Sequence, residues 1–528
     1  MNHDITKVYL LNVPLENDYK NTLYFENKES QQAYFHSRVV KSYTDFSYQR
    51  KDSFIRVPSH FDSLQNINYV MYQNPQHSNK WYYAFVTDIK YVQDDRTDLI
   101  IEIDYLQTWL FDYNVKESFV EREHVSDDRI GIHTYPENVE LGEYICENRV
   151  SDSATDEALR DCCYIFASTL TTILNESGEF DHTDGKIYNG VYSGIEYFRF
   201  NDVLGYKIWH DLYAEHDGAL DAIQGFFLAP KWLAPYKPTE QGAGVIQESE
   251  TASTLTFSIP KNISSLNGYT PRNKKLFTYP YKYMMCTNNV GGSAIYHYEK
   301  FITESNDCSF MVRGALTPGC SVRMMPTNYN GASVNVEEGL GLGKYPICSY
   351  TTDMFTNWMT QNSLNIATDI VGGSLQMGVG IAGMGTAMGA AFGSLALASG
   401  VNSIASTLAQ VHQQSMTPPQ ANGNVNSGDV VFASGLNTFD FYQMSIKKEY
   451  AQIIDKYFDM FGYKVCMVKK PNTNHRSRYW YTKTIDVNID GAIPNKDMQK
   501  IKDCYNNGIT FWRNPEEIQD YSKSNTIV

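Results

Sequence analysis

The stretch Lys80–Val92, KWYYAFVTDIKYV, is rich in aromatic and β-branched residues, and Leu99–Leu110, LIIEIDYLQTWL, follows it after a short polar interval. In the second stretch apolar side chains alternate with acidic ones. One face collects Leu99, Ile101, Ile103 and Tyr105, and the other carries Glu102 and Asp104. Alternation with a period of two is typical of a strand with one buried and one solvated face. The two stretches therefore predict an antiparallel hairpin with a six-residue loop at 93–98, within a run of strands and turns from Val8 to Arg149.

Two helices are predicted near the other end of the chain. Apolar residues recur there at helical spacing, and Gly462 follows as a C-terminal cap. These residues are Ile446, Tyr450, Ile453, Ile454, Tyr457, Phe458 and Phe461. A second helix begins near Asn495 and ends at Gly508, with Met498, Ile501 and Tyr505 on one face. Strands are expected between the two helices, at Tyr463–Val468 and Arg478–Ile489. Strands and helices in this order predict a β-rich α+β fold.

Composition limits the function classes. The chain has 528 residues and a formal net charge of −16, so it is not expected to be a general nucleic-acid binder, which needs concentrated positive charge. An acidic body is compatible with DNA passing without sticking, and equally with plain solubility. The 39 tyrosines suit β-strands and subunit contacts, although a monomeric β-rich protein fits them as well. Nine scattered cysteines without a CxxC pair favour reduced thiols made in a cytoplasm, and no secretory signal is expected at the N-terminus.

The most unusual segment lies between Asp369 and Asp429, which enclose fifty-nine residues, 370–428, without Asp, Glu, Lys or Arg. Its first part, Ile370–Ile404, consists mostly of Gly, Ala, Ser, Met, Leu, Val and Ile. The residues expected to be membrane-active are Ile370, Val371, Gly372, Leu375, Met377, Val379, Ile381, Met384, Gly385, Met388, Gly389, Phe392, Gly393, Leu395, Leu397, Val401 and Ile404. Gly385, Gly389 and Gly393 form a doubled GxxxG spacing, which permits close helix–helix approach.

Three interpretations of Ile370–Ile404 compete. A buried core helix is shorter and poorer in glycine than this stretch. A transmembrane helix needs about 20 apolar residues, which are available, but Gln376 and Asn402 lie within a moderately hydrophobic sequence. We favour a conditional segment that is sheltered in one state and inserted in a membrane in another. Pro418 and Pro419 then act as the loop hinge, because neither can donate a backbone hydrogen bond, and Ala421–Gly428 is expected to be flexible.

Several separated motifs resemble the tail-knob, or distal-tail-tube, proteins of small short-tailed picovirus-type phages that infect Gram-positive bacteria. The N-terminal ones are 17–22 (NDYKNT), 79–87 (NKWYYAFVT), 102–109 (EIDYLQTW), 117–120 (ESFV) and 122–125 (REHV). The C-terminal ones are 461–465 (FGYKV), 468–472 (VKKPN) and 507–512 (NGITFW). The resemblance covers Val8–Arg149 and Tyr345–Arg513. The middle retains only short pieces such as 279–281 (YPY) and 313–316 (RGAL).

The resemblance implies a structural protein of the virion tail, synthesised in the bacterial host cytoplasm, without enzymatic activity or cofactor. Six copies would form a hexameric tube through which double-stranded DNA passes without sequence-specific binding. Residues 1–150, with 345–369 and 430–528, would build β-barrel tube walls, and 151–344 an outer knob domain. Residues 370–429 would plug the lumen and later insert in the host cytoplasmic membrane as a channel. The implied partners are other tail proteins, namely the lower collar or proximal tube and a cell-wall-degrading tip protein.

Two alternative functions remain, a tail-tip cell-wall hydrolase and a host-receptor-binding tip protein. The sequence has no HExxH, GxSxG or GxxxxGK[ST] motif. A glycosidase needs only two carboxylates, and no pair stands out among 60 acidic residues. We expect no catalytic residue and no metal site: His124 is interpreted as structural, and His297 has no ligand at suitable spacing. The basic residues Lys469, Lys470, Arg476 and Arg478 predict a solvated loop, and a DNA contact or a contact with a neighbouring subunit's acids are the alternatives.

Overall fold

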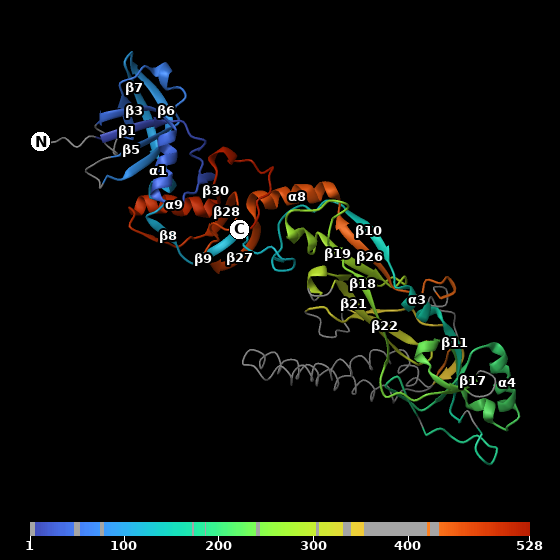
Figure 1. The fold of residues 1–528 in the computed structure, drawn as a ribbon. Coiled ribbons are helices and arrows are strands. Elements are labelled where there is room, and N and C mark those ends of the chain that lie inside the picture. The colour runs from blue at the N-terminus through green and yellow to red at the C-terminus, as the bar shows by residue number, and fades with distance from the viewer. Residues whose placement is uncertain are drawn as a thin grey trace. The chain divides into compact units, whose positions relative to one another are not determined.

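The computed structural model describes residues 6–46, 53–73, 79–171, 174–184, 186–238, 243–301, 306–330, 339–352, 420–422 and 432–528. The chain divides into two compact units. The first combines residues 1–142, 269–276 and 448–528, and the second combines 143–268 and 277–447. Both ends of the chain therefore contribute to the first unit, where the N-terminal blue and C-terminal red segments lie side by side (Figure 1).

The first unit contains two large sheets. One has the strand order β3-β1-β5-β6-β7-β4, and the other β2-β30-β28-β9-β27. Strand β2 pairs in parallel with β30, which fastens the two ends of the chain together. The strands are β1 Thr6–Leu11, β2 Asn21–Leu23, β3 Val39–Phe46, β4 Phe54–Val57, β5 Tyr69–Gln73, β6 Trp81–Gln93, β7 Arg96–Ile103, β9 Ser118–Glu123, β27 Tyr463–Lys469, β28 Tyr479–Ile485 and β30 Ile509–Trp512. Helix α1, Lys28–Ser37, buries Phe35 against Tyr69 of β5, with ring centroids 5.4 Å apart.

The predicted hairpin is confirmed as β6 and β7, and its buried face carries Leu99, Ile101 and Ile103. The expected six-residue loop is wrong. Gln93 pairs with Arg96, so only two residues form the turn, because the strands continue through the polar interval. Strand β7 ends at Ile103, and helix α2, Tyr105–Trp109, follows.

Asp104 corrects the expectation of a solvated acidic face. Its side chain is 2% exposed and caps α2 by accepting from the Gln107 amide at 3.0 Å. It also accepts from the Tyr69 hydroxyl at 2.8 Å. Burial raises the pKa of Asp104 to about 6. Glu102, in contrast, is exposed as predicted.

Both predicted C-terminal helices are present. Helix α8, Lys448–Phe461, ends before Gly462, whose φ of 64° is the left-handed conformation of a helix cap. It buries Ile454 and Phe458, but Ile453 is 66% exposed, and Ile446 belongs to the preceding strand. Helix α9, Asn495–Asn507, buries Ile501 and Tyr505 as predicted.

The strand expected over Arg478–Ile489 is two strands. β28 ends at Ile485, and the chain turns at Asp486, whose φ is 52°. The next strand, β29, Ile489–Gly491, pairs with β8, Tyr113–Val115, in a separate two-stranded sheet.

The described residues of the second unit form three larger sheets and a hairpin. The sheet orders are β10-β26-β19-β20, β16-β17-β14-β11-β15-β24-β25 and β18-β21-β22-β23, and the hairpin is β12-β13. The strands are β10 Tyr144–Val150, β11 Cys162–Ser168, β12 Lys186–Tyr188, β13 Val191–Ser193, β14 Glu196–Phe200, β15 Ile223–Pro230, β16 Tyr236–Pro238, β17 Ala243–Ile246, β18 Ser253–Pro260, β19 Lys282–Thr287, β20 Ser293–Tyr296, β21 Asp307–Ala315, β22 Ser321–Pro326, β23 Leu340–Gly341, β24 Ile347–Thr352, β25 Gln420–Asn422 and β26 Asp440–Ile446. The α-helices with described bounds are α3, Ser153–Arg160, and α4, Val203–Ala214.

One hydrophobic core joins the three sheets of the second unit. It includes Phe227 of β15, Met284 of β19, Phe310 of β21 and Phe441 of β26, all fully buried. Strands in two units and a few helices make the chain a β-rich α+β protein, as predicted.

Candidate functional site

The residues expected to enter a membrane lie outside the described part of the chain. Ile370–Ile404 and the hinge residues Pro418 and Pro419 all fall within 353–419. No helix among the described residues is long and apolar enough to cross a membrane. The candidate site is therefore the place where this segment joins the folded chain.

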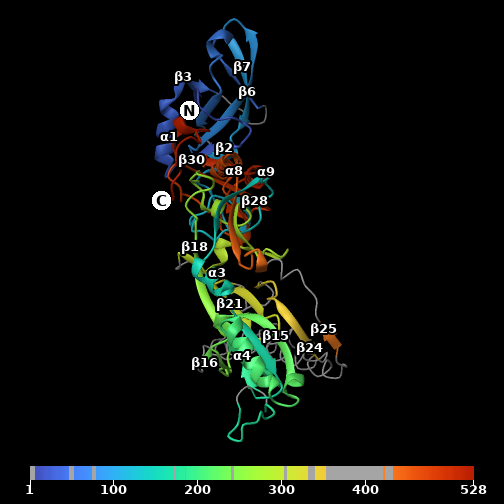
Figure 2. The same ribbon diagram turned by 90° about the vertical axis from the view of Figure 1, so that its right-hand side faces the viewer.

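The two ends of the segment are held beside each other at one edge of the seven-stranded sheet. Strand β24 ends at Thr352 and β25 begins at Gln420, and these two residues are direct partners in an antiparallel ladder. Tyr350 pairs with Asn422 at the other end of the same ladder. Figure 2 shows β25 beside β24, which follows β15. The chain thus leaves and returns at one point of the sheet.

Strand β25 also corrects the predicted extent of the loop. Ala421 and Asn422 were expected in a flexible stretch within 370–429, but they pair with β24. A three-residue strand with a neighbour on one side is a weak attachment to a sheet edge. The residues themselves do not predict this strand, because Ala and Asn are depleted in strands.

Aromatic residues outside the ladder anchor both flanks in the same core. Tyr345 is fully buried, and its hydroxyl donates to the Leu159 carbonyl at 2.7 Å. Its backbone amide donates to the Gly319 carbonyl at 2.9 Å. On the returning side Phe432 packs against Tyr345, with ring centroids 5.8 Å apart. Both flanks of the segment are therefore packed in the core of the second unit.

Three of the four basic residues predicted to lie in a solvated loop, Lys469, Arg476 and Arg478, are instead bound within the first unit. Lys469 donates to Glu123 at 2.5 Å, and Glu123 is 1% exposed. Arg476 is 8% exposed and donates to the carbonyls of Val125 at 2.8 Å and Asn525 at 3.1 Å. Arg478 binds two acids of its own chain, Glu517 at 2.8 Å and Asp520 at 3.4 Å. Only Lys470 of the four is exposed.

His124 has the structural role predicted for it. Its Nδ1 accepts a hydrogen bond from the Tyr481 amide at 2.7 Å, so Nε2 carries the proton and donates to the Asp459 carbonyl at 3.0 Å. Burial, with Arg476 nearby, lowers the pKa of His124 to about 3. A neutral histidine with both nitrogens occupied joins strand β28 to helix α8 and has no free position for catalysis.

A buried ion-pair network completes the first unit. The Glu137 carboxylate is fully covered and binds both Arg122 and Lys275. Lys275 Nζ lies 2.5 Å from one oxygen, and the Lys464 amide donates to the same oxygen at 2.8 Å. Burial lowers the pKa of Lys275. This network fixes the segment 269–276, which the chain inserts into the first unit.

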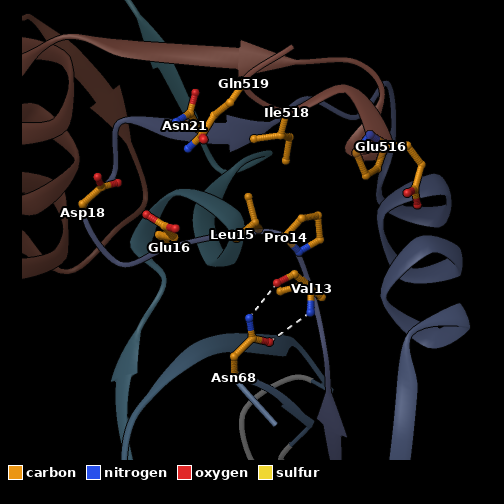
Figure 3. Close-up of a pocket in the computed structure, with 11 residues that line it drawn as sticks. Val13, Pro14, Leu15, Glu16, Asp18, Asn21, Asn68, Glu516, Ile518 and Gln519 are labelled. Carbon is orange, nitrogen blue, oxygen red and sulfur yellow. Dashed lines mark hydrogen bonds between the residues drawn. The ribbon is translucent and has the colours of Figure 1, made fainter. Parts of the chain in front are cut away.

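Two polar pockets of the first unit are the places to look for hydrolytic chemistry. The pocket in Figure 3 holds about 450 Å³ and is lined by acids, amides and apolar residues but by no histidine or cysteine. Asn68 spans its floor by bonding the Val13 amide at 2.9 Å and the Val13 carbonyl at 2.6 Å. Asp18 caps the Lys20 amide at 3.0 Å, and Glu516 is paired with Arg38.

The other polar pocket, of about 470 Å³, contains Asp128 and Asp459. Asp128 accepts from the Tyr463 hydroxyl at 2.6 Å and the Lys274 amide at 3.1 Å. Asp459 binds Arg272 at 3.1 Å and Asn273 at 2.8 Å. Burial raises the pKa of both carboxyls. Each is engaged with donors of its own chain, so their first role is to hold the fold together.

Metal chemistry has no support among the residues that the structure describes, where no group of His, Cys, Asp and Glu side chains is arranged to hold an ion. His297 stacks on Tyr279, with ring centroids 4.1 Å apart and planes 5° from parallel. Its Nδ1 lies 3.8 Å from Glu299.

Comparison with known proteins places this geometry in a family. The family described as the C-terminal domain of Bacillus phage phi29 tail knob protein gp9 matches residues 247–526, more than half of the chain. The Caudoviral major tail protein N-terminus matches residues 4–114. The tail knob proteins gp9 of Bacillus phages PZA and phi29 are 26% and 25% identical, and each alignment covers 98% of both chains.

A solved structure has the same fold. The tail knob protein gp12 of bacteriophage C1 superimposes with a TM-score of 0.62 over 99% of this chain and 100% of that chain, at 15% identity. The matches cover the described parts of both units and include the sequence motifs that carry the family resemblance. The chain belongs to the family of phage tail knob proteins represented by gp9 of Bacillus phage phi29, structural components of the virion tail.

Proposed function

We propose that the chain forms a six-membered ring of the distal tail, through which double-stranded DNA is ejected. The segment Ile370–Ile404 plugs the ring and then enters the host cytoplasmic membrane as a channel. The observation that carries this proposal is the pairing of β24 with β25, which gathers both ends of the uncharged segment at one edge of a folded sheet.

Attachment through the β24–β25 ladder is suited to a segment that moves from the ring lumen into a membrane while the second unit stays folded. Between Thr352 and Gln420 the chain has 67 residues, 353–419, and its core anchors Tyr345 and Phe432 lie outside that excursion. Residues 370–428 carry no Asp, Glu, Lys or Arg. Their transfer into lipid avoids the cost of burying such a charge, about 3 kcal/mol or more for each one. The glycines at 385, 389 and 393 allow neighbouring copies to pack closely in a bilayer.

The distribution of charge in the chain favours passage of DNA through the ring without tight binding. Affinity for DNA comes mainly from cations that replace phosphate counterions. Here the chain is acidic overall, and Lys469, Arg476 and Arg478 are occupied by acceptors of their own chain. We therefore propose a lumen that is neutral or acidic. None of the described pockets favours the alternative of a cell-wall hydrolase over this function.

The function is tested by placing charge in the segment at constant length. The double substitution Gly385→Asp with Gly389→Asp should leave assembly intact and abolish release of dye from liposomes. A matched variant, Asn424→Asp with Asn426→Asp, adds the same charge beyond the apolar stretch and should release dye as the unmodified chain does. Equal release by the Gly385/Gly389 variant would refute membrane entry by this segment.

A further inference from the structure

The four-stranded sheet β10-β26-β19-β20 of the second unit has one buried face and one partly exposed face. Its inner face belongs to the core, where Met284, Cys286, Tyr296 and Phe441 are fully buried. β10, β26 and β19 lie side by side in Figure 1. Residues that alternate with the buried ones point to the other side, and they are unusually apolar for a surface.

The strand registers arrange these outward residues in two rows. Met444 of β26 has Cys146 and Tyr283 as direct partners on its two sides. In the next row Met285 of β19 has Tyr442 and Ile295 as its partners. Cys146 is exposed, Ile295 is 49% exposed, and the other four are half-buried. We call these six residues the Tyr–Met face.

Aromatic rings extend the Tyr–Met face beyond one end of the rows. Tyr144, 36% exposed, meets Tyr283 edge to face at 5.5 Å. Tyr279, 41% exposed, meets the same ring at 5.8 Å. Tyr279 is itself held by stacking on His297. The rings are therefore positioned by one another and lose little conformational freedom when a partner covers them.

The Tyr–Met face is also poor in free charge. None of its six residues is charged, and Arg149, the partner of Tyr442, is bound to Asp440 at 2.7 Å. The neighbouring Lys282 is fully buried and reaches Glu147 at 2.6 Å on the inner side. Glu143 and Lys447 pair with each other near the end of the sheet. Copies of a chain with a net charge of −16 repel one another, so a surface free of acids is where they can meet.

We propose that the Tyr–Met face is a contact between neighbouring copies of this chain in the tail. The cores of protein interfaces are enriched in tyrosine and methionine and depleted of charge, which matches these residues. The inference rests on the proposed ring. A closed ring of more than two copies needs heterologous contacts, so this face meets a different surface of the next copy.

Cys146 provides a probe of the contact without any substitution. Purified full-length chain is separated into rings and unassembled copies, treated briefly with N-ethylmaleimide, and analysed by peptide mass spectrometry. Cys146 should react at least about tenfold more slowly in rings, because a buried interface core excludes water and reagent. Cys466, in the first unit, reports any general change in reactivity. Equal reactivity of Cys146 in rings and unassembled copies would overturn the proposal.

A charged substitution gives the second test. Met444→Asp should weaken association at least about tenfold, since it buries an unpaired charge at the contact. Thr256→Asp adds the same charge to an exposed strand position of another sheet in the same unit and should assemble normally. Thermal unfolding of each variant checks its fold, and the Cys146 measurement decides the matter if Met444→Asp does not fold.

The two proposals fail in different ways. If neither purified chain nor virions contain rings, the proposed function fails and this inference fails with it. If rings form and Met444→Asp assembles as well as Thr256→Asp, only the Tyr–Met face is reassigned. Normal assembly of Met444→Asp with reduced binding to anionic liposomes would make the face a membrane contact, which also contradicts the proposal.

Discussion

The first unit and the β24–β25 edge of the second unit are held together in opposite ways. Around α8 the first unit uses buried charges with several partners each, such as Glu137 and Asp455. At the β24–β25 edge, three residue pairs join a short outer strand to its neighbour. A buried charge is costly to leave unpaired, whereas the end of a sheet edge opens at small cost. The buried network of the first unit is therefore expected to resist local opening more strongly than the β24–β25 edge.

The largest loss of stability is expected on removal of the Glu137 carboxylate. Glu137→Ala leaves Arg122 and Lys275 buried without their shared carboxylate, so the free energy of unfolding should fall by about 3–5 kcal/mol. Urea titration followed by tryptophan fluorescence measures the loss. The exposed pair of Lys116 and Asp490 in the same unit provides the control, since Asp490→Ala should cost less than about 1 kcal/mol. Similar losses in both variants would mean that the buried network does not fix the first unit.

The stability of the first unit should depend on pH through the buried His124. The pKa of His124 is about 3 in the folded chain and about 6.5 in the unfolded one, so the unfolded state binds the extra proton between these values. The contribution of His124 to the free energy of unfolding is fully present above about pH 6.5. It decreases as the pH falls, by about 3 kcal/mol at pH 4. His124→Gln removes the titrating group, so its free energy of unfolding should depend less on pH over this window. Parallel pH profiles for the two proteins would contradict this role of His124.

Asp104 acts in the opposite direction. Its pKa is raised to about 6, so the folded state holds the proton and the contribution of Asp104 decreases as the pH rises from about 4 to about 6. Measurements on His124→Gln should therefore be compared with the unmodified chain at each pH, because the Asp104 contribution is common to both.

The smallest effect is expected at the sheet edge. Ala421→Pro removes a backbone donor from β25 and disturbs its pairing with β24. The free energy of unfolding should fall by only about 1 kcal/mol or less, because proline is tolerated on edge strands. Thermal unfolding measures this change. A loss as large as that of Glu137→Ala would show that the edge is part of the stabilising core.

The sequence predicted the elements whose signals are local. Leu99, Ile101 and Ile103 alternate within one strand, and the apolar pattern of α8 ends at a glycine cap. The strand and the helix could therefore both be predicted from the sequence. Asp104 was misassigned, because its donor Tyr69 lies 35 residues away. Arg476 and Arg478 were predicted to lie in a solvated loop for the same reason. Arg476 donates to the carbonyl of Val125 and Arg478 donates to Glu517, and both acceptors lie far from these arginines in the sequence. Periodicity reports which side of an element is buried but not what meets a polar side chain there.

The Tyr–Met face was missed for a related reason. Its strands are Tyr144–Val150, Lys282–Thr287, Ser293–Tyr296 and Asp440–Ile446, which come from three distant parts of the chain. Each strand alone shows an ordinary alternation of residues, and only the registers place the methionines and tyrosines in rows. The β24–β25 ladder is equally non-local, because its two strands are separated by the apolar segment.

We expect the apolar segment to be membrane-active and separable from the fold that carries it. Deletion of residues 372–415 keeps β24, both prolines and β25 and removes most of the uncharged stretch. The shortened chain should assemble into rings of the same stoichiometry by mass photometry and fail to release dye from liposomes that the unmodified chain permeabilises. Full release by the shortened rings would contradict the account and leave the segment a purely structural part of the tail.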